Sequence, residues 1–215
     1  MKRVTKNDSS KARRFATEII KFLHQKLIDK YTFTQRIVGS AVYNTIIEDN
    51  DGFWDVDYQL LLTKNSPEYK VNGLKNATKI KNDFFNSINN KFKNNKKYRV
   101  ENSTTAVTVI DLFSKFSIDF VIIRFFPKNY EIIRRNNKDD SGKNEYTWNQ
   151  LRKYNEAYEK FNSFSSEEKK YLIENYVLPR KVKEKKKNND DYSKKSSSEI
   201  FIEEVNNYVS RKRNN

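Results

Sequence analysis

The stretch Trp54-Asp55-Val56-Asp57-Tyr58-Gln59-Leu60-Leu61-Leu62 decides the fold, because apolar and polar residues alternate along it. Strict alternation predicts a half-buried strand. Side chains two residues apart in a strand share a face. Asp55 and Asp57 therefore project together, about 7 Å apart at the backbone for a rise of about 3.4 Å per residue. Aspartate is depleted in strands, so two of them on one strand face need a reason.

One reason is metal binding. The two carboxylates can lean onto a pair of metal ions about 3.5–4 Å apart, the separation used in two-metal displacement. Magnesium prefers oxygen ligands and usually combines a few carboxylates with substrate phosphates. The other reason is an ordinary solvated strand face, and an Asp-x-Asp pattern by itself favours that second interpretation.

The upstream pair Gly39-Ser40 changes this balance. Residues 36–38 are predicted to form a short strand that ends at Gly39, and residues 41–47 to begin a helix with Ser40 as its N-cap. Glycine lets a ligand approach the backbone closely. A helix N-terminus offers free N–H groups and a positive dipole end to a phosphate. The sequence therefore predicts a phosphate-binding turn just before the Asp-x-Asp strand.

A third acid is expected from a hairpin. Residues 105–112 and 116–126 read as strands and residues 113–115 as the turn between them. Asp119 shares its strand face with Val121 and Ile123, where a carboxylate is costly unless a cation or hydrogen bonds compensate it. Asp111 is the rival candidate, but its place at a strand end is explained by turn capping, and we rank Asp119 above it.

Together, Gly39-Ser40, Thr45, Asp55-x-Asp57 and Asp119 resemble the active-site signature of the DNA polymerase beta-like nucleotidyltransferases. Within that superfamily, residues 39–45 are similar to the Gly-Ser-x-x-x-Gly-Thr segment of the bacterial cyclic GMP–AMP synthase-like enzymes, which make nucleotide second messengers in antiphage signalling. Asn44 stands here in place of the usual glycine. The resemblance covers residues 33–126.

The resemblance implies an α+β fold with a mixed sheet backed by helices, and a nucleoside triphosphate as substrate. Gly39, Ser40 and Thr45 would bind the nucleotide. Asp55, Asp57 and Asp119 would hold two Mg²⁺ or Mn²⁺ ions, and Asp119 would also draw the proton from the attacking hydroxyl. The implied reaction is attack of that hydroxyl on the α-phosphate with release of pyrophosphate, to give a second-messenger nucleotide, an extended RNA or another modified acceptor.

The expected organisation is a core over residues 1–135 that includes an N-terminal amphipathic helix, then a polar loop over residues 136–145. A helical extension over residues 146–179 follows, in which Ser165 and Glu168 fit a capping box. Residues 180–198 are charged and serine-rich, which predicts a basic flexible linker. A short helix over residues 199–215 ends the chain.

The net charge of +15 on 215 residues points to anionic partners, either nucleotides or RNA. Aromatic residues stand among basic ones at residues 91–93 and 96–99, a pattern that suits backbone tracking with base stacking. The equal alternative is a solvated lysine-rich surface. The chain has no cysteine and one histidine, His24, which excludes disulfides and thiolate or histidine-based zinc sites.

No apolar run is long enough to span a bilayer, and the first residues do not lead into a signal peptide. We therefore expect a cytoplasmic protein without a membrane partner. Two other functional interpretations stay open: a noncatalytic basic module that binds nucleic acid, and an interaction protein such as half of a toxin–antitoxin pair. The preferred base and the acceptor are not fixed by the sequence.

Overall fold

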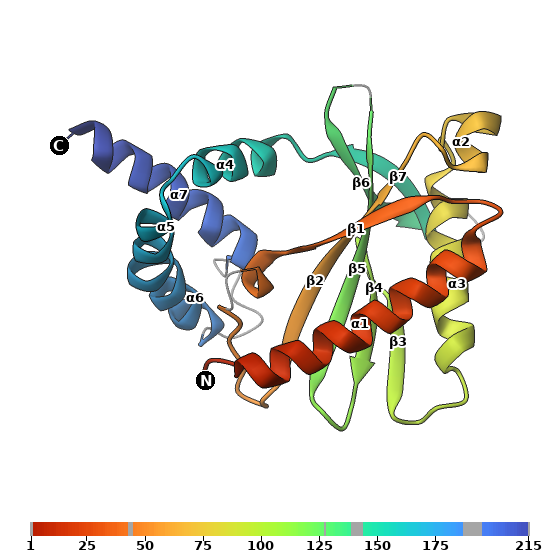
Figure 1. Ribbon diagram of the computed structural model, residues 1–215, viewed down its shortest axis with the longest axis horizontal. Coiled ribbons are helices and arrows are strands. Elements are labelled where there is room, and N and C mark those ends of the chain that lie inside the picture. Colours follow the sequence, from red (N-terminus) through yellow and green to blue (C-terminus); the bar gives the residue numbers. More distant parts are fainter. Residues whose placement is uncertain (1, 43–44, 127, 139–143, 187–194, 215) are drawn as a thin grey trace. The chain divides into compact units, whose positions relative to one another are not determined.

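A computed structural model describes residues 2–42, 45–126, 128–138, 144–186 and 195–214 (Figure 1). The chain divides into two compact units, one formed by Arg3–Gln150 and one that contains Leu151–Asn215. The first unit carries a seven-stranded sheet and all the residues that the sequence singles out as a candidate site. Among the described residues, no helix combines the length and the apolar character needed to cross a bilayer.

The sheet has the strand order β1-β2-β5-β4-β3, with β6 paired to the end of β5 and β7 paired to β6. Only β2 and β5 run parallel among these pairs. The strands are β1 (Phe33–Val38), β2 (Trp54–Leu62), β3 (Tyr98–Asn102), β4 (Ala106–Asp111), β5 (Phe116–Phe125), β6 (Tyr130–Lys138) and β7 (Asn144–Gln150). This mixed sheet with helices confirms the α+β class predicted from the sequence.

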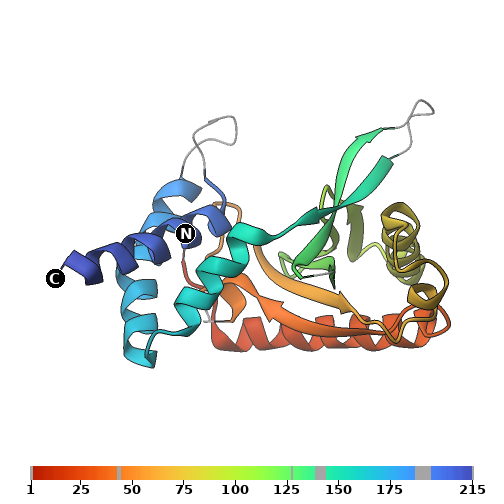
Figure 2. The same cartoon turned by 90° about the horizontal axis from the view of Figure 1, so that it is seen from above.

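The helices of this unit are α1 (Lys6–Leu27), α2 (Pro67–Asn72) and α3 (Ala77–Phe92). Figure 2 shows α1 lying along one side of β1 and β2. The apolar parity of β2 packs with the buried stripes of α1 and α3 in one hydrophobic core. Asp55 and Asp57, on the other parity, are half-buried. The predicted alternation in β2 and the predicted hairpin of β4 and β5 are thus both confirmed.

The predicted helix over residues 41–47 is wrong for the residues that are described. A single 3₁₀ turn, η1 (Gly39–Ala41), follows β1, and residues 43–44 lie outside the described part of the chain. Ile46 and Ile47 then pair with the N-terminal segment: the Val4 amide donates to the Ile46 carbonyl at 3.0 Å, and Ile47 forms a β-bridge with Arg3. Branched side chains favour this extended backbone over a helix.

The aromatic residues near the C-terminal end of α3 are not stacking platforms, which favours the second of the two interpretations of this segment. Phe92 is buried in the core. The ring of Tyr98 stacks on that of Phe15 from α1, with 4.9 Å between centroids. The basic side chains between Phe92 and Tyr98 are exposed or form an ion pair, whereas the two aromatic rings pack within the protein.

The chain after β5 differs from the expected loop and helix. Residues 130–138 and 144–150 form the antiparallel pair β6–β7, and residues 139–143 of the expected loop lie outside the described residues. Helix begins only at Arg152. The remaining elements are α4 (Arg152–Asn162), α5 (Ser166–Leu172), the π-helical turn η2 (Ile173–Val177), α6 (Leu178–Lys185) and α7 (Ser197–Asn214).

The linker expected from Arg180 is also corrected, because α6 continues to Lys185. Arg180 forms ion pairs with Glu203 and Glu204 of α7, and Glu184 is buried. These pairings let a highly charged segment pack as a helix. Residues 187–194 of the expected linker lie outside the described chain. The capping box is confirmed, since the side chains and backbone amides of Ser165 and Glu168 bond reciprocally.

Candidate functional site

The parallel pairing of β2 with β5 sets the acidic residues side by side. Asp57 lies directly opposite Asp119 in the register, and Asp55 lies opposite Ser117. All three aspartates are half-buried and occupy the strand parity opposite to the buried core positions. The structure therefore brings the three predicted acids to one face of the sheet.

Asp119 is held by the neighbouring strand. Thr108 on β4, its partner in the register, donates its hydroxyl to Asp119 Oδ1 at 2.6 Å. Burial raises the pKa of the Asp119 carboxyl, while the Thr108 hydrogen bond lowers it and the charge of Asp55 raises it further. The result is a net raised pKa, because a partly dehydrated carboxylate faces another negative charge.

The Gly39 turn touches the acidic face. Val38 pairs with Asp57 across the β1–β2 ladder, so the turn starts beside that carboxylate. Gly39 has φ +65°, and a Cβ atom placed on it would lie 2.7 Å from Asp57 Oδ2. Glycine is thus favoured by the backbone conformation, and a larger residue here would have to displace the Asp57 carboxylate. The Gly39 turn and the acidic face, which were predicted from separate parts of the sequence, therefore lie next to each other.

Ser40 and Thr45 play different parts at this turn. The Thr45 amide and hydroxyl both donate to the Ser40 carbonyl, at 2.8 and 3.2 Å. Thr45 is buried, whereas Ser40 is half-buried. The Thr45 side chain therefore closes the segment onto the turn, and its hydroxyl is engaged with backbone.

Asp111 caps the β4–β5 turn, the explanation that the sequence offered for it. Its Oδ1 accepts from the amides of Phe113 and Ser114, and Lys97 Nζ lies 3.1 Å from its Oδ2. Its side chain is almost fully buried within these contacts. The Asp111 carboxylate thus stabilises the β4–β5 turn.

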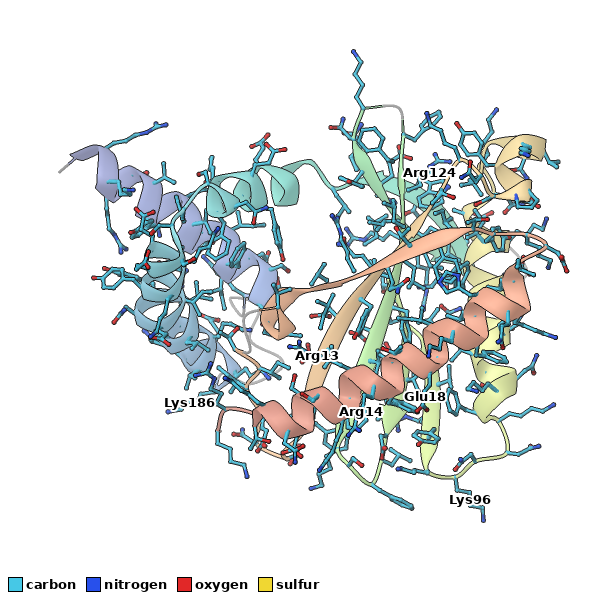
Figure 3. The ribbon with its side chains drawn as sticks, viewed as in Figure 1. Arg13, Arg14, Glu18, Lys96, Arg124 and Lys186 are labelled. Atoms are coloured by element: carbon cyan, nitrogen blue, oxygen red, sulfur yellow. The ribbon has the colours of Figure 1, made fainter. Side chains whose placement is uncertain are left out.

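Two basic residues near the site were missed by the sequence reasoning. Arg13 of α1 donates from its guanidinium to the Ala41 carbonyl of the turn, and Figure 3 shows it on the side of α1 toward β2. Nothing distinguishes it in the sequence from the other 42 lysines and arginines. Lys81 of α3 is fully buried and donates to the Thr105 carbonyl at 2.7 Å. Its place between Ala77 and Phe84, on the apolar stripe of α3, was a readable signal.

The acidic face has the donor chemistry of a magnesium or manganese site. Among the described residues, no group of three or more histidine, cysteine, aspartate or glutamate side chains lies in an arrangement that could hold a metal ion as it stands. Asp55, Asp57 and Asp119 offer carboxylate oxygens from one face, and a cation would relieve the burial and repulsion that raise the pKa of Asp119. These oxygens are of the ligand type that such an ion prefers.

Comparisons by sequence find no relative: no protein-family model and no curated protein matches the chain. Solved structures do match. The c-di-GMP synthase CdnE of Capnocytophaga granulosa, described as STING-associated, matches with a TM-score of 0.61 at 15% identity, over 95% of this chain and 61% of that one. GTP-bound DncV of Vibrio cholerae matches with a TM-score of 0.55 at 15% identity, over 95% of this chain and 52% of that one.

The CD-NTase CdnG of Bradyrhizobium diazoefficiens, in complex with GTP, matches with a TM-score of 0.50 at 12% identity, over 73% of this chain and 43% of its own. The chain therefore has the nucleotidyltransferase fold of the CD-NTase structures, as the resemblance of its motifs implied. It spans between about two fifths and three fifths of the length of these three structures.

Proposed function

We propose that this chain carries the catalytic core of a metal-dependent nucleotidyltransferase, which moves a nucleoside monophosphate from a nucleoside triphosphate to a hydroxyl. One observation supports the proposal most: Gly39 of the turn abuts Asp57, which stands opposite Asp119 on the parallel strand. A phosphate-binding turn and paired carboxylates at one place are what the reaction requires, and the fold is that of the CD-NTase structures.

In this proposal Asp55, Asp57 and Asp119 hold Mg²⁺ or Mn²⁺, up to two ions. Such ions, when bound, neutralise the triphosphate and the charge that develops on it. Ser40 donates a hydrogen bond to a triphosphate oxygen. Thr45 keeps the turn closed through its bonds to the Ser40 carbonyl.

Asp119 accepts the proton of the attacking hydroxyl, and Thr108 keeps its carboxylate oriented through the 2.6 Å hydrogen bond. The acceptor oxygen forms a bond to the α-phosphorus, the bond from that phosphorus to the bridging oxygen breaks, and pyrophosphate leaves with the electron pair.

The matching structures also suggest a class of acceptor for the proposed reaction. One matching structure is a c-di-GMP synthase and two others contain GTP. We therefore propose a nucleotide hydroxyl as the acceptor, with a small second-messenger nucleotide as the product and antiviral signalling as its use. RNA is the other acceptor to be tested.

The test is incubation of the purified chain with each labelled nucleoside triphosphate and Mg²⁺ or Mn²⁺, with and without RNA, followed by mass analysis of the products. The wild type is expected to release pyrophosphate and form a nucleotide adduct. Asp57→Asn should reduce transfer below detection. Asp29→Asn, which alters an exposed aspartate after α1, is the matched control and should keep full activity. Transfer that persists in Asp57→Asn would overturn the proposed site.

A further inference from the structure

The carbonyl groups of the Gly39–Ala41 turn are all occupied within the protein. The Gly39 carbonyl accepts from the Val42 amide at 3.3 Å, and the Ser40 carbonyl accepts from the Thr45 amide at 2.8 Å. The Ala41 carbonyl accepts from the guanidinium of Arg13. A turn that receives phosphate must direct its carbonyl oxygens elsewhere, because their partial negative charge repels the ligand.

Arg13 is the only one of these three donors that comes from outside the turn and the segment that follows it. It reaches the turn from α1, 28 positions earlier in the chain. Ala12 and Ala16 beside it on α1 are completely buried, as is Ala41 itself, so small side chains allow the helix and the turn to approach closely. Figure 3 shows Arg13 on this side of α1.

The Arg13 guanidinium is suited to hold the turn. Arg13 is half-buried, so its charge is only partly screened by water. An arginine holds a contact such as the one with the Ala41 carbonyl through a rigid planar fork.

We propose that Arg13 is a positioning residue for the nucleotide. By holding the Ala41 carbonyl, it fixes the Gly39–Ala41 turn in the conformation that accepts a triphosphate beside Asp57. This inference rests on the proposed function, since it concerns the same site. It assigns the role of Arg13 to substrate affinity and leaves the chemical step to the carboxylates.

The test compares Arg13→Met and Arg13→Lys with Arg14→Met, the matched control. Arg14 is the next residue on α1 and is exposed, so its replacement removes the same charge without touching the turn. Nucleoside triphosphate binding is measured by calorimetric titration, and KM and kcat are measured for transfer. Backbone hydrogen exchange at residues 39–42 and 45–47 is followed in the ligand-free protein.

Arg13→Met should weaken nucleotide binding about 10-fold to 100-fold, the range for loss of a hydrogen bond to a charged group. Amides of residues 39–42 and 45–47 should exchange faster, and kcat at saturating nucleotide should change less than about threefold, because the acids are untouched. Arg13→Lys, which keeps a donor and the charge, should recover part of the affinity. Arg14→Met should match the wild type.

Two results would overturn the inference while leaving the proposed function intact. One is wild-type affinity and exchange in Arg13→Met, and the other is a fall in kcat with unchanged KM in Arg13→Lys. The lysine variant keeps the test decisive if the methionine variant does not fold. A wild-type chain that binds no nucleoside triphosphate with either metal would overturn the proposed function, and this inference with it.

Discussion

Gly39 combines a positive φ with a close contact to Asp57, and a second glycine, Gly73, allows the two effects to be measured separately. Gly39 and Gly73 both have φ +65°. A Cβ on Gly39 would press on Asp57 Oδ2 at 2.7 Å, whereas a Cβ on Gly73 would meet no atom within 4 Å. The backbone strain of a non-glycine residue, about 1–2 kcal/mol, is common to both positions.

We therefore expect Gly39→Ala to lower the free energy of unfolding by more than Gly73→Ala, and to abolish nucleotidyl transfer. Gly73→Ala should cost about 1 kcal/mol and leave transfer intact. Urea denaturation of the two variants and of the wild type, with transfer assays at one fixed triphosphate concentration, measures both effects. Equal losses of unfolding free energy in the two variants would show that the Asp57 side chain moves aside at little cost. The close contact with Gly39 would then add nothing to the backbone strain.

Lys81 gives the chain a pH dependence that can be assigned to one side chain. Its ammonium group is fully buried, and burial, together with the charge of Arg135, lowers its pKa from 10.5 to about 7, against the opposing charge of Asp119. Between pH 7 and 10.5 the unfolded chain therefore binds more protons than the native chain. The free energy of unfolding rises with pH across this window, by up to about 1.4 kcal/mol per pH unit from this group.

Replacing Lys81 with methionine should remove this slope. Urea denaturation at pH 7, 8 and 9 should show the wild type gaining stability relative to Lys81→Met as the pH rises. Lys93→Met alters an exposed lysine just after α3 and should run parallel to the wild type. Parallel curves for Lys81→Met and the wild type would mean that the buried amine is compensated in the native state.

At the scale of the elements, the sequence pattern correctly predicted strands that have one buried face. It failed where the secondary structure of a segment depends on which other strand pairs with it. The alternation in β2 and the stripe of α1 report burial directly, so both were found. Residues 146–150 were predicted to be helical because Trp148 and Leu151 begin a series of apolar residues spaced by three or four. They belong to β7 because β6 pairs with them and the Thr78 hydroxyl bonds to the Tyr146 backbone, 68 positions away.

The candidate site shows the same division. The sequence singled out the three acids and Gly39, because carboxylates within a predicted strand and a glycine at the end of a predicted strand are visible in the local sequence pattern. It did not single out Arg13, because the partner of this side chain is a backbone carbonyl that only the fold brings close. The short turn replaced the predicted helix for a similar reason, since the N-terminal segment pairs with Ile46 and Ile47.

The capping box of α5 is an element whose contribution can be isolated. The Glu168 amide donates to Ser165 Oγ at 3.2 Å, and the Ser165 amide donates to Glu168 Oε2 at 2.8 Å. Ser165→Ala should cost about 1 kcal/mol of helix stability, which speeds hydrogen exchange at the amides of Glu168 and Lys169 roughly fivefold. Ser166→Ala, an exposed neighbour at the first helical position, is the control. Unchanged exchange in Ser165→Ala would mean that packing alone holds this end of α5.

At the scale of the whole chain, 43 basic residues face 28 acidic ones, and some of the basic side chains are engaged in internal ion pairs. Lys97 pairs with the buried carboxylate of Asp111, and Arg99 pairs with Glu101 at 2.8 Å. Removing Lys97 would leave Asp111 buried and one partner short, so a surface experiment must avoid it. Lys93 and Lys96 are exposed, and Figure 3 marks Lys96 just before β3.

These two lysines test whether the positive charge serves RNA. If single-stranded RNA binds there, its affinity should fall steeply with salt, and replacing Lys93 and Lys96 with glutamine should reduce the slope of log K against log salt by about 0.7 for each lost phosphate contact. Lys64 and Lys75, exposed elsewhere on the same unit, are the charge-matched control. Nucleoside triphosphate binding should not change in either double variant. No RNA binding at low salt would remove RNA as the acceptor and leave a small nucleotide product, whereas RNA binding without transfer under either metal would favour a noncatalytic module.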